Sequence, residues 1–354
     1  MAFQPLPMML FNIALLVLVF QLAINVAEGS SSSCNLFNGN WVMDPSYPLY
    51  DSTLCPFIEK EFNCQKNGRP DQLYLKYRWQ PHGCNLPRFS GREFLEKYKG
   101  KNIMFVGDSL TRDQYMSFTC MLYNDVRGTN YTMIREGMIS TLTFWDYDLK
   151  LLLDRNAYLV DLEPTKIGGL LKIDTISPNA KLWANSDMLV FNTWHWWTYR
   201  GAQQPWKYIK IGDKLIKDMD RMAALEIGLN TWATWVDTEV NHARTRVFFL
   251  GASPSHYNGT EWQEHGRNCS GQQQPLPGST YPMGPPPALG VQKKVLSKMK
   301  THVELLDITV LSQLRIDGHP SFYGVSSTGC DCTHWCLAGV PDTWNLILNN
   351  FIFP

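Results

Sequence analysis

Short apolar runs alternate with longer amphipathic stretches along most of this 354-residue chain. An apolar run of five or six residues is typical of a strand buried on both faces, and apolar positions recurring every three or four residues are typical of a helix. The apolar runs are NIMFV at 102–106, DMLVFN at 187–192, RVFFLG at 246–251 and VELLDI at 303–308. The helical patterns cover 110–123, about 212–240 and 309–315. This alternation predicts an α/β fold in which helices cover a parallel sheet.

Two stretches lack the alternation. From Cys34 to Cys84 the chain is rich in turn residues, aromatic residues and cysteines, which indicates a small subdomain held by disulfides. We therefore divide the chain into a cysteine-rich subdomain over 30–98 and an α/β domain over 99–354. The segment 272–290 is too rich in proline and glycine for regular structure, and we expect a long surface loop there.

The amino terminus carries a signal for entry into the secretory pathway. Residues 8–27 form an apolar stretch long enough to cross a bilayer, although no lysine or arginine precedes it. Small residues near Ala27 and Gly29 give a loose cleavage site. Residues 1–29 are thus either a cleaved signal peptide or a retained signal-anchor. The first case predicts secretion to the cell wall, and the second a single-pass type II protein of the Golgi membrane.

Cysteine content agrees with an oxidising compartment. Nine cysteines follow the apolar segment, and in a secretory chain that number implies bridges, with one thiol left over. They are Cys34, Cys55, Cys64, Cys84, Cys120, Cys269, Cys330, Cys332 and Cys336. Glycosylation sequons at Asn130, Asn258 and Asn268 point the same way. Lysine plus arginine and aspartate plus glutamate each number 32, so no overall charge favours nucleic acid as a partner.

The strand predicted at 102–106 ends in Gly107-Asp108-Ser109, directly before a predicted helix. Ligands of open parallel sheets collect where strands end and helices begin. A serine there can act as a nucleophile, with helix N–H groups stabilising the oxyanion. Asp or Ser is also the ordinary residue that caps a helix, so the triplet alone leaves both interpretations open.

A second cluster, GCDCTHWCLAGVPDTWN at 329–345, supplies the other groups that a nucleophilic serine needs. His334 can serve as the base, and Asp331 can hold its imidazole in the required tautomer. Bridged cysteines on either side would fix this loop. The competing interpretation is a zinc site made of Cys330, Cys332, Cys336 and His334; the oxidising compartment and the ligand spacing argue against it, and we expect no metal.

A third motif, FNTWHWW at 191–197, follows the strand predicted at 187–192. The side-chain amide of Asn192 can donate to an oxyanion, together with the backbone N–H of Ser109. His195 and the tryptophans at 194, 196 and 197 can line a sugar-binding wall, or fill the core. Further along, Arg315, Asp317 and His319 favour a structural salt bridge and turn over a groove lining.

The three motifs together resemble the trichome birefringence-like family of plant cell-wall polysaccharide O-acetyltransferases, related to the GDSL/SGNH hydrolases. The resemblance rests on NGNWV, YPLYDSTLCPFI and NCQKNGRPD in the first subdomain, FVGDSLTRDQ, and DCTHWCLAGVPDTWN. It implies an SGNH-like catalytic domain with Ser109 as nucleophile and Asp331 and His334 completing the triad. It also implies that Asn192 is an oxyanion donor. Gly107, Arg112, His195 and Trp196 are further candidates for binding the oxyanion or the substrate.

Two positions depart from the family pattern. Asp113 stands where the pattern usually has Asn, which places an extra carboxyl near the nucleophile. Cys330 is additional to the usual cysteines, so it is expected to be the free thiol while the other eight form four bridges.

The resemblance implies acetyl transfer to a wall polysaccharide (xylan, mannan or pectin) through an acetyl-serine. No bound cofactor is expected, only an acetyl donor of unknown identity, with a membrane acetyl-donor protein as a possible partner. The first alternative is a polysaccharide acetylesterase that uses the same triad, since water and a sugar hydroxyl attack the same acyl-serine. The second is a non-catalytic protein that binds or bridges wall polysaccharides.

Overall fold

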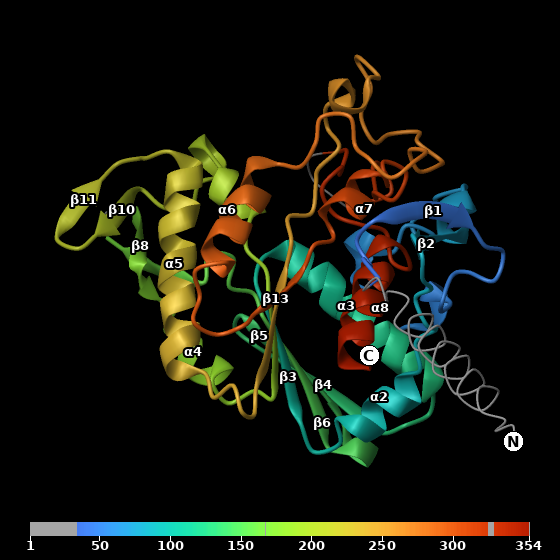
Figure 1. The fold of residues 1–354 in the computed structure, drawn as a ribbon, viewed down its shortest axis with the longest axis horizontal. Coiled ribbons are helices and arrows are strands. Elements are labelled where there is room, and N and C mark those ends of the chain that lie inside the picture. Colours follow the sequence, from blue (N-terminus) through green and yellow to red (C-terminus); the bar gives the residue numbers. More distant parts are fainter. Residues whose placement is uncertain (1–33, 167, 325–328, 354) are drawn as a thin grey trace, which may run out of the picture.

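The computed structural model describes residues 34–166, 168–324 and 329–353 (Figure 1). The segment expected to be a signal peptide or signal-anchor lies outside these ranges. Within them, no helix has both the length and the apolar character needed to cross a membrane.

A seven-stranded sheet runs through the middle of the molecule. Its order is β13 (Glu304–Leu306), β12 (Arg246–Leu250), β9 (Met188–Phe191), β3 (Asn102–Val106), β6 (Leu149–Asp154), β5 (Ile139–Phe144) and β4 (Tyr131–Glu136). The first five pair in parallel, and β5 and β4 add an antiparallel edge. The four predicted strands are all in the parallel part, which confirms the α/β class.

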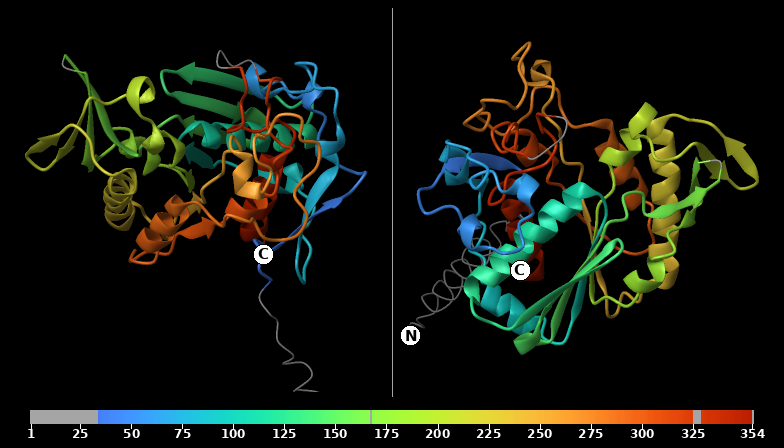
Figure 2. Two further views of the ribbon diagram at one scale, coloured as in Figure 1. Left: turned by 90° about the horizontal axis from the view of Figure 1, so that it is seen from above. Right: turned by 180° about the vertical axis from the view of Figure 1, so that it is seen from behind.

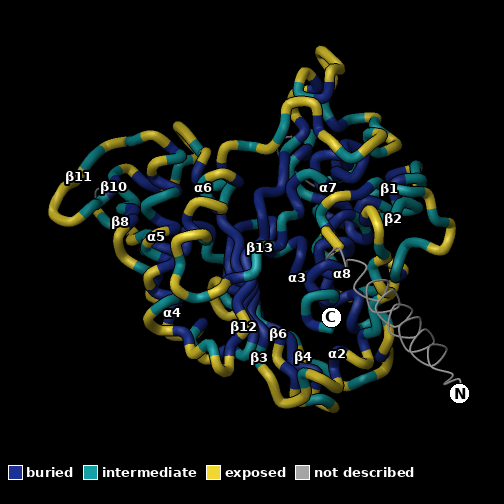
Figure 3. The backbone as a smooth tube through the Cα atoms, viewed as in Figure 1, coloured by how far each residue is buried: buried dark blue, intermediate teal, exposed yellow. Residues whose placement is uncertain are grey.

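Helices cover both faces of this sheet (Figure 2). One face carries α2 (Gly91–Lys97), α3 (Ser109–Asp125) and α8 (Val340–Ile352); the other carries α4 (Ala180–Trp183), α5 (Arg221–Glu239) and α6 (Pro287–Leu296). Strand β3 shows how the layers form, because Ile103 and Phe105 join the first core while Met104 and Val106 join the second. The central strands are therefore buried on both faces (Figure 3).

A smaller sheet extends from the side of the molecule that carries α5 (Figure 1). It contains β7 (Val160–Thr165), β8 (Gly168–Ile176), β10 (Tyr208–Ile211) and β11 (Lys214–Ile216). Short turns of helix connect the elements: α7 (Thr309–Gln313) and the 3-10 segments η1 (Ser52–Leu54), η2 (Lys60–Phe62), η3 (Leu73–Lys76), η4 (Trp145–Tyr147), η5 (His195–Thr198), η6 (Gly201–Gln203) and η7 (Gly259–Trp262).

Two predicted boundaries are wrong. The helix expected over 212–240 begins only at Arg221, because Asp220 caps it by accepting the N–H groups of Met222 and Ala223. The residues before it form the β10–β11 hairpin, which turns at Gly212 with φ +54°. The loop expected over 272–290 ends earlier, since α6 begins at Pro287, a residue suited to the first turn of a helix.

The cysteine-rich segment packs on the α3–α8 side of the main sheet. Its strands β1 (Gly39–Met43) and β2 (Tyr77–Pro81) form an antiparallel pair. Disulfides join Cys34 to Cys84, Cys55 to Cys120, Cys64 to Cys336 and Cys269 to Cys332. Cys330 is the free cysteine among the described residues, so the expected division into eight bridged cysteines and one thiol is confirmed. The domain boundary at residue 98 stays a prediction.

The three sequon asparagines lie outside the core. Asn130 and Asn258 are exposed and Asn268 is half-buried, so the surface gives a glycan access to at least the first two. Their glycosylation stays a prediction.

Candidate active site

The candidate nucleophile lies where β3 meets α3. Asp108 caps the helix, because its Oδ1 accepts the N–H of Leu110 at 2.9 Å. At Gly107 a Cβ would lie 2.2 Å from the carbonyl oxygen of Asn192, so the close approach of two strand ends excludes any side chain there. Ser109 consequently starts a 17-residue helix, at the end where the helix dipole favours negative charge.

Folding brings the nucleophile to the residues predicted to activate it. The Oγ of Ser109 lies 2.7 Å from Nε2 of His334, and Nδ1 of His334 lies 2.8 Å from Oδ2 of Asp331. Asp331 is held in turn by the backbone, since its Oδ1 accepts the N–H groups of Thr333 and His334. The contacts place serine, imidazole and carboxylate in the order that a serine acyl transferase or hydrolase requires.

Electrostatics suit these roles. Burial lowers the pKa of His334, but its hydrogen bond to Asp331 and the charges of Asp113 and Asp331 outweigh this effect, so the net pKa lies above its ordinary value. Burial raises the pKa of Asp331, yet its bonds to His334 and to two backbone N–H groups bring it far below the usual range. Asp331 therefore stays ionised, and a carboxylate in this position is suited to stabilise a protonated imidazole at His334.

Asp108 does more than cap a helix. Its Oδ1 also accepts the Nδ2–H of Asn192 at 2.9 Å, and its Oδ2 accepts the backbone N–H of His195 at 3.3 Å. One buried carboxyl thus joins the strand ends of β3 and β9. The second Nδ2 hydrogen of Asn192 is left for another acceptor. Sequence reasoning missed this role, because the capping pattern at Asp108 gives no signal of a partner 84 residues away.

Two family models together cover nearly the whole chain. Residues 86–351 match the GDSL/SGNH-like acyl-esterase family found in Pmr5 and Cas1p, and residues 32–85 match the PMR5 N-terminal domain. Protein trichome birefringence-like 41 of Arabidopsis thaliana is 55% identical, with 96% of this chain and 94% of that protein aligned. Protein trichome birefringence-like 38 of the same plant is 54% identical, with 90% and 83% aligned.

The chain belongs to the trichome birefringence-like family. Family membership supports acetyl transfer or acetyl-ester hydrolysis on plant cell-wall polysaccharides as the general activity, and with the disulfides it fits the secretory pathway. The family relationship also agrees with the structure, because the parallel-rich sheet and its covering helices are consistent with an SGNH-like fold.

In this trichome birefringence-like protein, some residues of the FNTWHWW motif line a cavity and others lie in the core. A cavity of about 510 Å³ is lined by Trp194, His195 and Thr198, and on its other sides by residues that include Pro254, Glu261 and Pro286. The Nε2 of His195 bonds to the carbonyl oxygen of Ser253.

The last two tryptophans of the motif, Trp196 and Trp197, pack against other side chains of the protein. Trp197 is fully buried and donates its Nε1–H to Thr193, so it belongs to the core and not to a sugar-binding wall. Trp196 is half-buried and packs against Tyr158 and Tyr199, and it does not line the cavity.

The side chain of Arg112 is engaged in contacts within the protein and is not free to bind a substrate. Its guanidinium pairs with Glu59 at 2.8 Å and Glu61 at 3.1 Å, and it lies over the ring of Phe62. Phe62 in turn packs against the ring of His334. Arg112 thus joins the catalytic helix to the cysteine-rich segment, whose glutamates carry no sequence signal of this contact.

The motif RIDGHPSFYG is structural around its arginine, as expected. Arg315 and Asp317 form a buried bidentate pair, with Nε to Oδ1 at 2.7 Å. The loop that carries the triad is braced by Cys332, bridged to Cys269, and by Cys336, bridged to Cys64. Among the described residues, the sulfur group that could hold a metal contains Cys330 and the bridged pair Cys269–Cys332, so it offers one thiol.

Asp113, the departure from the family pattern, is a buried carboxyl close to the base. Its Oδ2 accepts the N–H of Trp335 at 3.0 Å, and its Oδ1 has no hydrogen-bond partner. Burial raises the pKa of Asp113 to about 7, against the opposing charges of His334 and Arg112. The protonated form is therefore favoured in the folded protein below neutral pH.

We expect Asp113→Asn to stabilise the protein in alkaline solution. A carboxyl whose pKa is raised on folding contributes stability that is present at low pH and is lost as pH rises through the folded pKa, here about 7. At pH 8 the variant should be more stable by up to about 4 kcal/mol, and at pH 4 by almost nothing. Urea unfolding at both pH values measures this, and an equal difference at the two would contradict it.

Proposed function

We propose that this protein transfers an acetyl group through Ser109 to a hydroxyl of a plant cell-wall polysaccharide, such as xylan, mannan or pectin. The observation that carries the proposal is the hydrogen-bonded chain from Ser109 through His334 to Asp331. A secretory location, in the Golgi membrane or the cell wall, belongs to the same proposal, which the disulfides and the family relationship support.

The reaction runs in two balanced steps. In the first, Nε2 of His334 takes the Oγ proton of Ser109 while Oγ attacks the acetyl carbonyl carbon; the bond to the donor breaks, and His334 returns the proton to the departing donor oxygen. In the second, His334 takes the proton of a sugar hydroxyl, whose oxygen attacks the acetyl-serine. The Ser109 oxygen then leaves and regains its proton.

The negative oxygen of each tetrahedral intermediate needs hydrogen-bond donors. The backbone N–H of Ser109, at the helix terminus, and the second Nδ2 hydrogen of Asn192 are the donors that this role would use. Asp108 orients Asn192 for it through the 2.9 Å bond.

A specific observation also favours hydrolysis. Ser109 and His334 are only half-buried, so water has access to an acetyl group on Ser109. Hydrolysis of polysaccharide acetyl esters is therefore the second candidate function. Non-catalytic binding of wall polysaccharide is the third, and it requires that no acetyl chemistry occur at all.

Mass spectrometry of the full-length protein separates these candidates. The protein is mixed with a small acetyl ester as donor, and with xylan, mannan or galacturonan fragments as acceptors. Transfer predicts an acetyl group on Ser109 followed by acetylated fragments, and hydrolysis predicts free acetate with no acetylated fragment. Turnover without any acetyl group on Ser109, under rapid acid quenching, would reject the acyl-serine mechanism.

Trp194→Ala should weaken binding of polysaccharide and leave the chemistry intact. Trp194 lines the cavity together with His195, whose backbone N–H bonds to Asp108 next to the proposed nucleophile, and loss of one stacked sugar ring corresponds to about a tenfold rise in KM for long fragments. Activity toward a small acetyl ester should stay within about twofold, because the residues that line the cavity do not include Ser109, Asp331 or His334. The exposed Trp145, replaced in the same way, is the control. Equal KM values for the two variants would exclude Trp194 from the binding site.

A further inference from the structure

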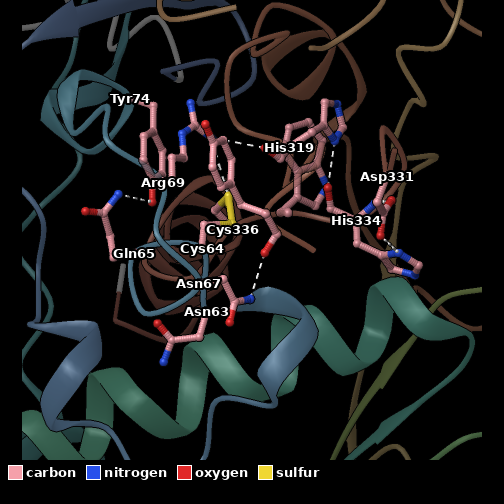
Figure 4. Close-up of a disulfide and its surroundings, with 12 residues drawn as sticks. Asn63, Cys64, Gln65, Asn67, Arg69, Tyr74, His319, Asp331, His334 and Cys336 are labelled. Atoms are coloured by element: carbon pink, nitrogen blue, oxygen red, sulfur yellow. Dashed lines mark hydrogen bonds and ion pairs between the residues drawn. A yellow bond between two sulfur atoms is a disulfide. The ribbon is translucent and has the colours of Figure 1, made fainter. Parts of the chain in front are cut away.

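Two buried histidines lie next to the triad and have no part in the reaction just described. His256 follows β12, and His319 precedes the catalytic loop; both are at most 1% exposed. The ring of His319 stacks on Trp335 with centroids 4.1 Å apart. The ring of His256 meets the edges of Trp262 and His319. Figure 4 shows His319 close to His334 and Asp331.

Each outer ring nitrogen of this pair faces a carbonyl oxygen. The Nδ1 of His319 lies 2.6 Å from the carbonyl oxygen of His334, and the Nε2 of His256 lies 3.0 Å from that of Gln313. A carbonyl oxygen only accepts, so both of these nitrogens must carry a hydrogen. The inner nitrogens, Nδ1 of His256 and Nε2 of His319, are 2.6 Å apart.

Two neutral imidazole rings carry too few hydrogens for these three contacts. Two neutral imidazoles carry two hydrogens, and both are used at the carbonyls. The inner contact would then set two lone pairs against each other at 2.6 Å. A third hydrogen, between the inner nitrogens, satisfies all three contacts.

We propose that His256 and His319 share this third hydrogen, and that the resulting single positive charge and its hydrogen bond fix the carbonyl of His334 and thereby the catalytic imidazole. Both histidines are positioning residues in this role, which rests on the function proposed above. His256 also holds the loop directly, since its backbone N–H donates to the carbonyl of Cys332 at 2.8 Å.

Some groups around the two histidines disfavour the positive charge, and others favour it. Burial, which removes the hydration of the charged ring, is the largest effect on both histidines: the pKa of His319 falls to about 4, and that of His256 falls well below its ordinary value. The nearby charges that act on His319 are Asp331, which favours protonation, and His334 and Arg69, which oppose it. The charged pair is nevertheless favoured, because the face of Trp335 stabilises a stacked cation and the neutral pair leaves the buried nitrogen–nitrogen contact without a hydrogen.

Counting ring hydrogens tests the proposal independently of any enzymatic activity. Neutron diffraction from crystals of the full-length protein, or nitrogen-15 NMR of histidine-labelled protein, reports the hydrogens on both rings at neutral pH. We expect three, one of them between the inner nitrogens. Two hydrogens would overturn the shared charge whether or not Ser109 forms an acetyl-serine.

His256→Gln separates charge from structure. Its side-chain amide can donate to Nε2 of His319, so His319 becomes neutral and keeps its Nδ1–H on the carbonyl of His334. With the positive charge gone, His334 binds its proton more readily, and the acid limb of kcat/KM for a small acetyl ester should move up by about half a pH unit. If the acid limb of the variant lies at the same pH as that of the wild type, the proposed shared charge is wrong, whatever the maximal value of kcat/KM. His302→Gln, an exposed histidine at the amino end of β13, is the control.

His319→Phe tests the positioning role, because phenylalanine keeps a ring on Trp335 but cannot bond to His334. We expect kcat for the same ester to fall about tenfold or more while KM changes less than about threefold. Unchanged kcat in a variant that melts near the wild-type temperature overturns the positioning role.

Discussion

Ser109→Ala should reduce acetyl turnover by about 10³-fold or more, because no other group replaces the attacking oxygen. The helix terminus and the Asn192 amide remain, so weak residual activity from binding alone is consistent with the mechanism. Initial rates with a small acetyl ester, and acetyl transfer to polysaccharide fragments, both measure the loss. Intact-protein mass spectrometry should find no acetyl group on residue 109.

The structure offers a matched control on the same helix. Ser117 is buried in α3 and donates to Asp342 at 2.6 Å, so Ser117→Ala should lower stability by about 1–3 kcal/mol and leave turnover within a few-fold. His334→Ala should match Ser109→Ala, and the double variant should be no worse than either, because the two groups act as a unit. Losses that multiply would contradict a shared proton transfer.

Removal of the bridge between Cys64 and Cys336, with serine at both positions, should lower the free energy of unfolding by about 2–5 kcal/mol. This bridge spans 272 residues and ties the cysteine-rich segment to the catalytic loop (Figure 4). Cys336 is two residues from His334, so we also expect the loop to lose order and kcat to fall. Denaturant unfolding and initial rates measure the two effects.

Cys330→Ser is the control, because Cys330 forms no bridge. It should leave stability and the four-disulfide map unchanged. If instead the double serine variant is as stable and as active as wild type, the Cys64–Cys336 bridge has no structural role at the active site.

The central fold could be predicted from the sequence because its strands are short, continuous apolar runs. NIMFV gives β3, and the Gly-Asp-Ser turn after it gives the start of α3. The apolar runs did not mark β4, β5 and β7, because polar residues interrupt all three strands (YTMIRE, ISTLTF and VDLEPT). Strand β11 was predicted as part of the helix over 212–240, because its strand conformation depends on pairing with β10 and not on local pattern.

The site was readable only in part. The residue types of Ser109, Asp331 and His334 carry their chemistry in the sequence, so motif and resemblance together were enough to name them. The remaining contacts join residues far apart in the chain: Arg112 with Glu59, and His256 with His319. No spacing or periodicity encodes such pairs, since tertiary packing alone sets them.

The proposed nucleophile Ser109 and its proposed base His334 are 225 positions apart, which is almost the full length of the domain predicted over 99–354. A ribosome must therefore complete nearly the whole polypeptide before any nucleophile can be activated. A nascent chain that ends before residue 334 has its serine but nothing to deprotonate it. In the folded protein a cut after residue 330 leaves His334 attached through the Cys269–Cys332 and Cys64–Cys336 bridges, so removal of the base requires reduction of both bridges as well as proteolysis.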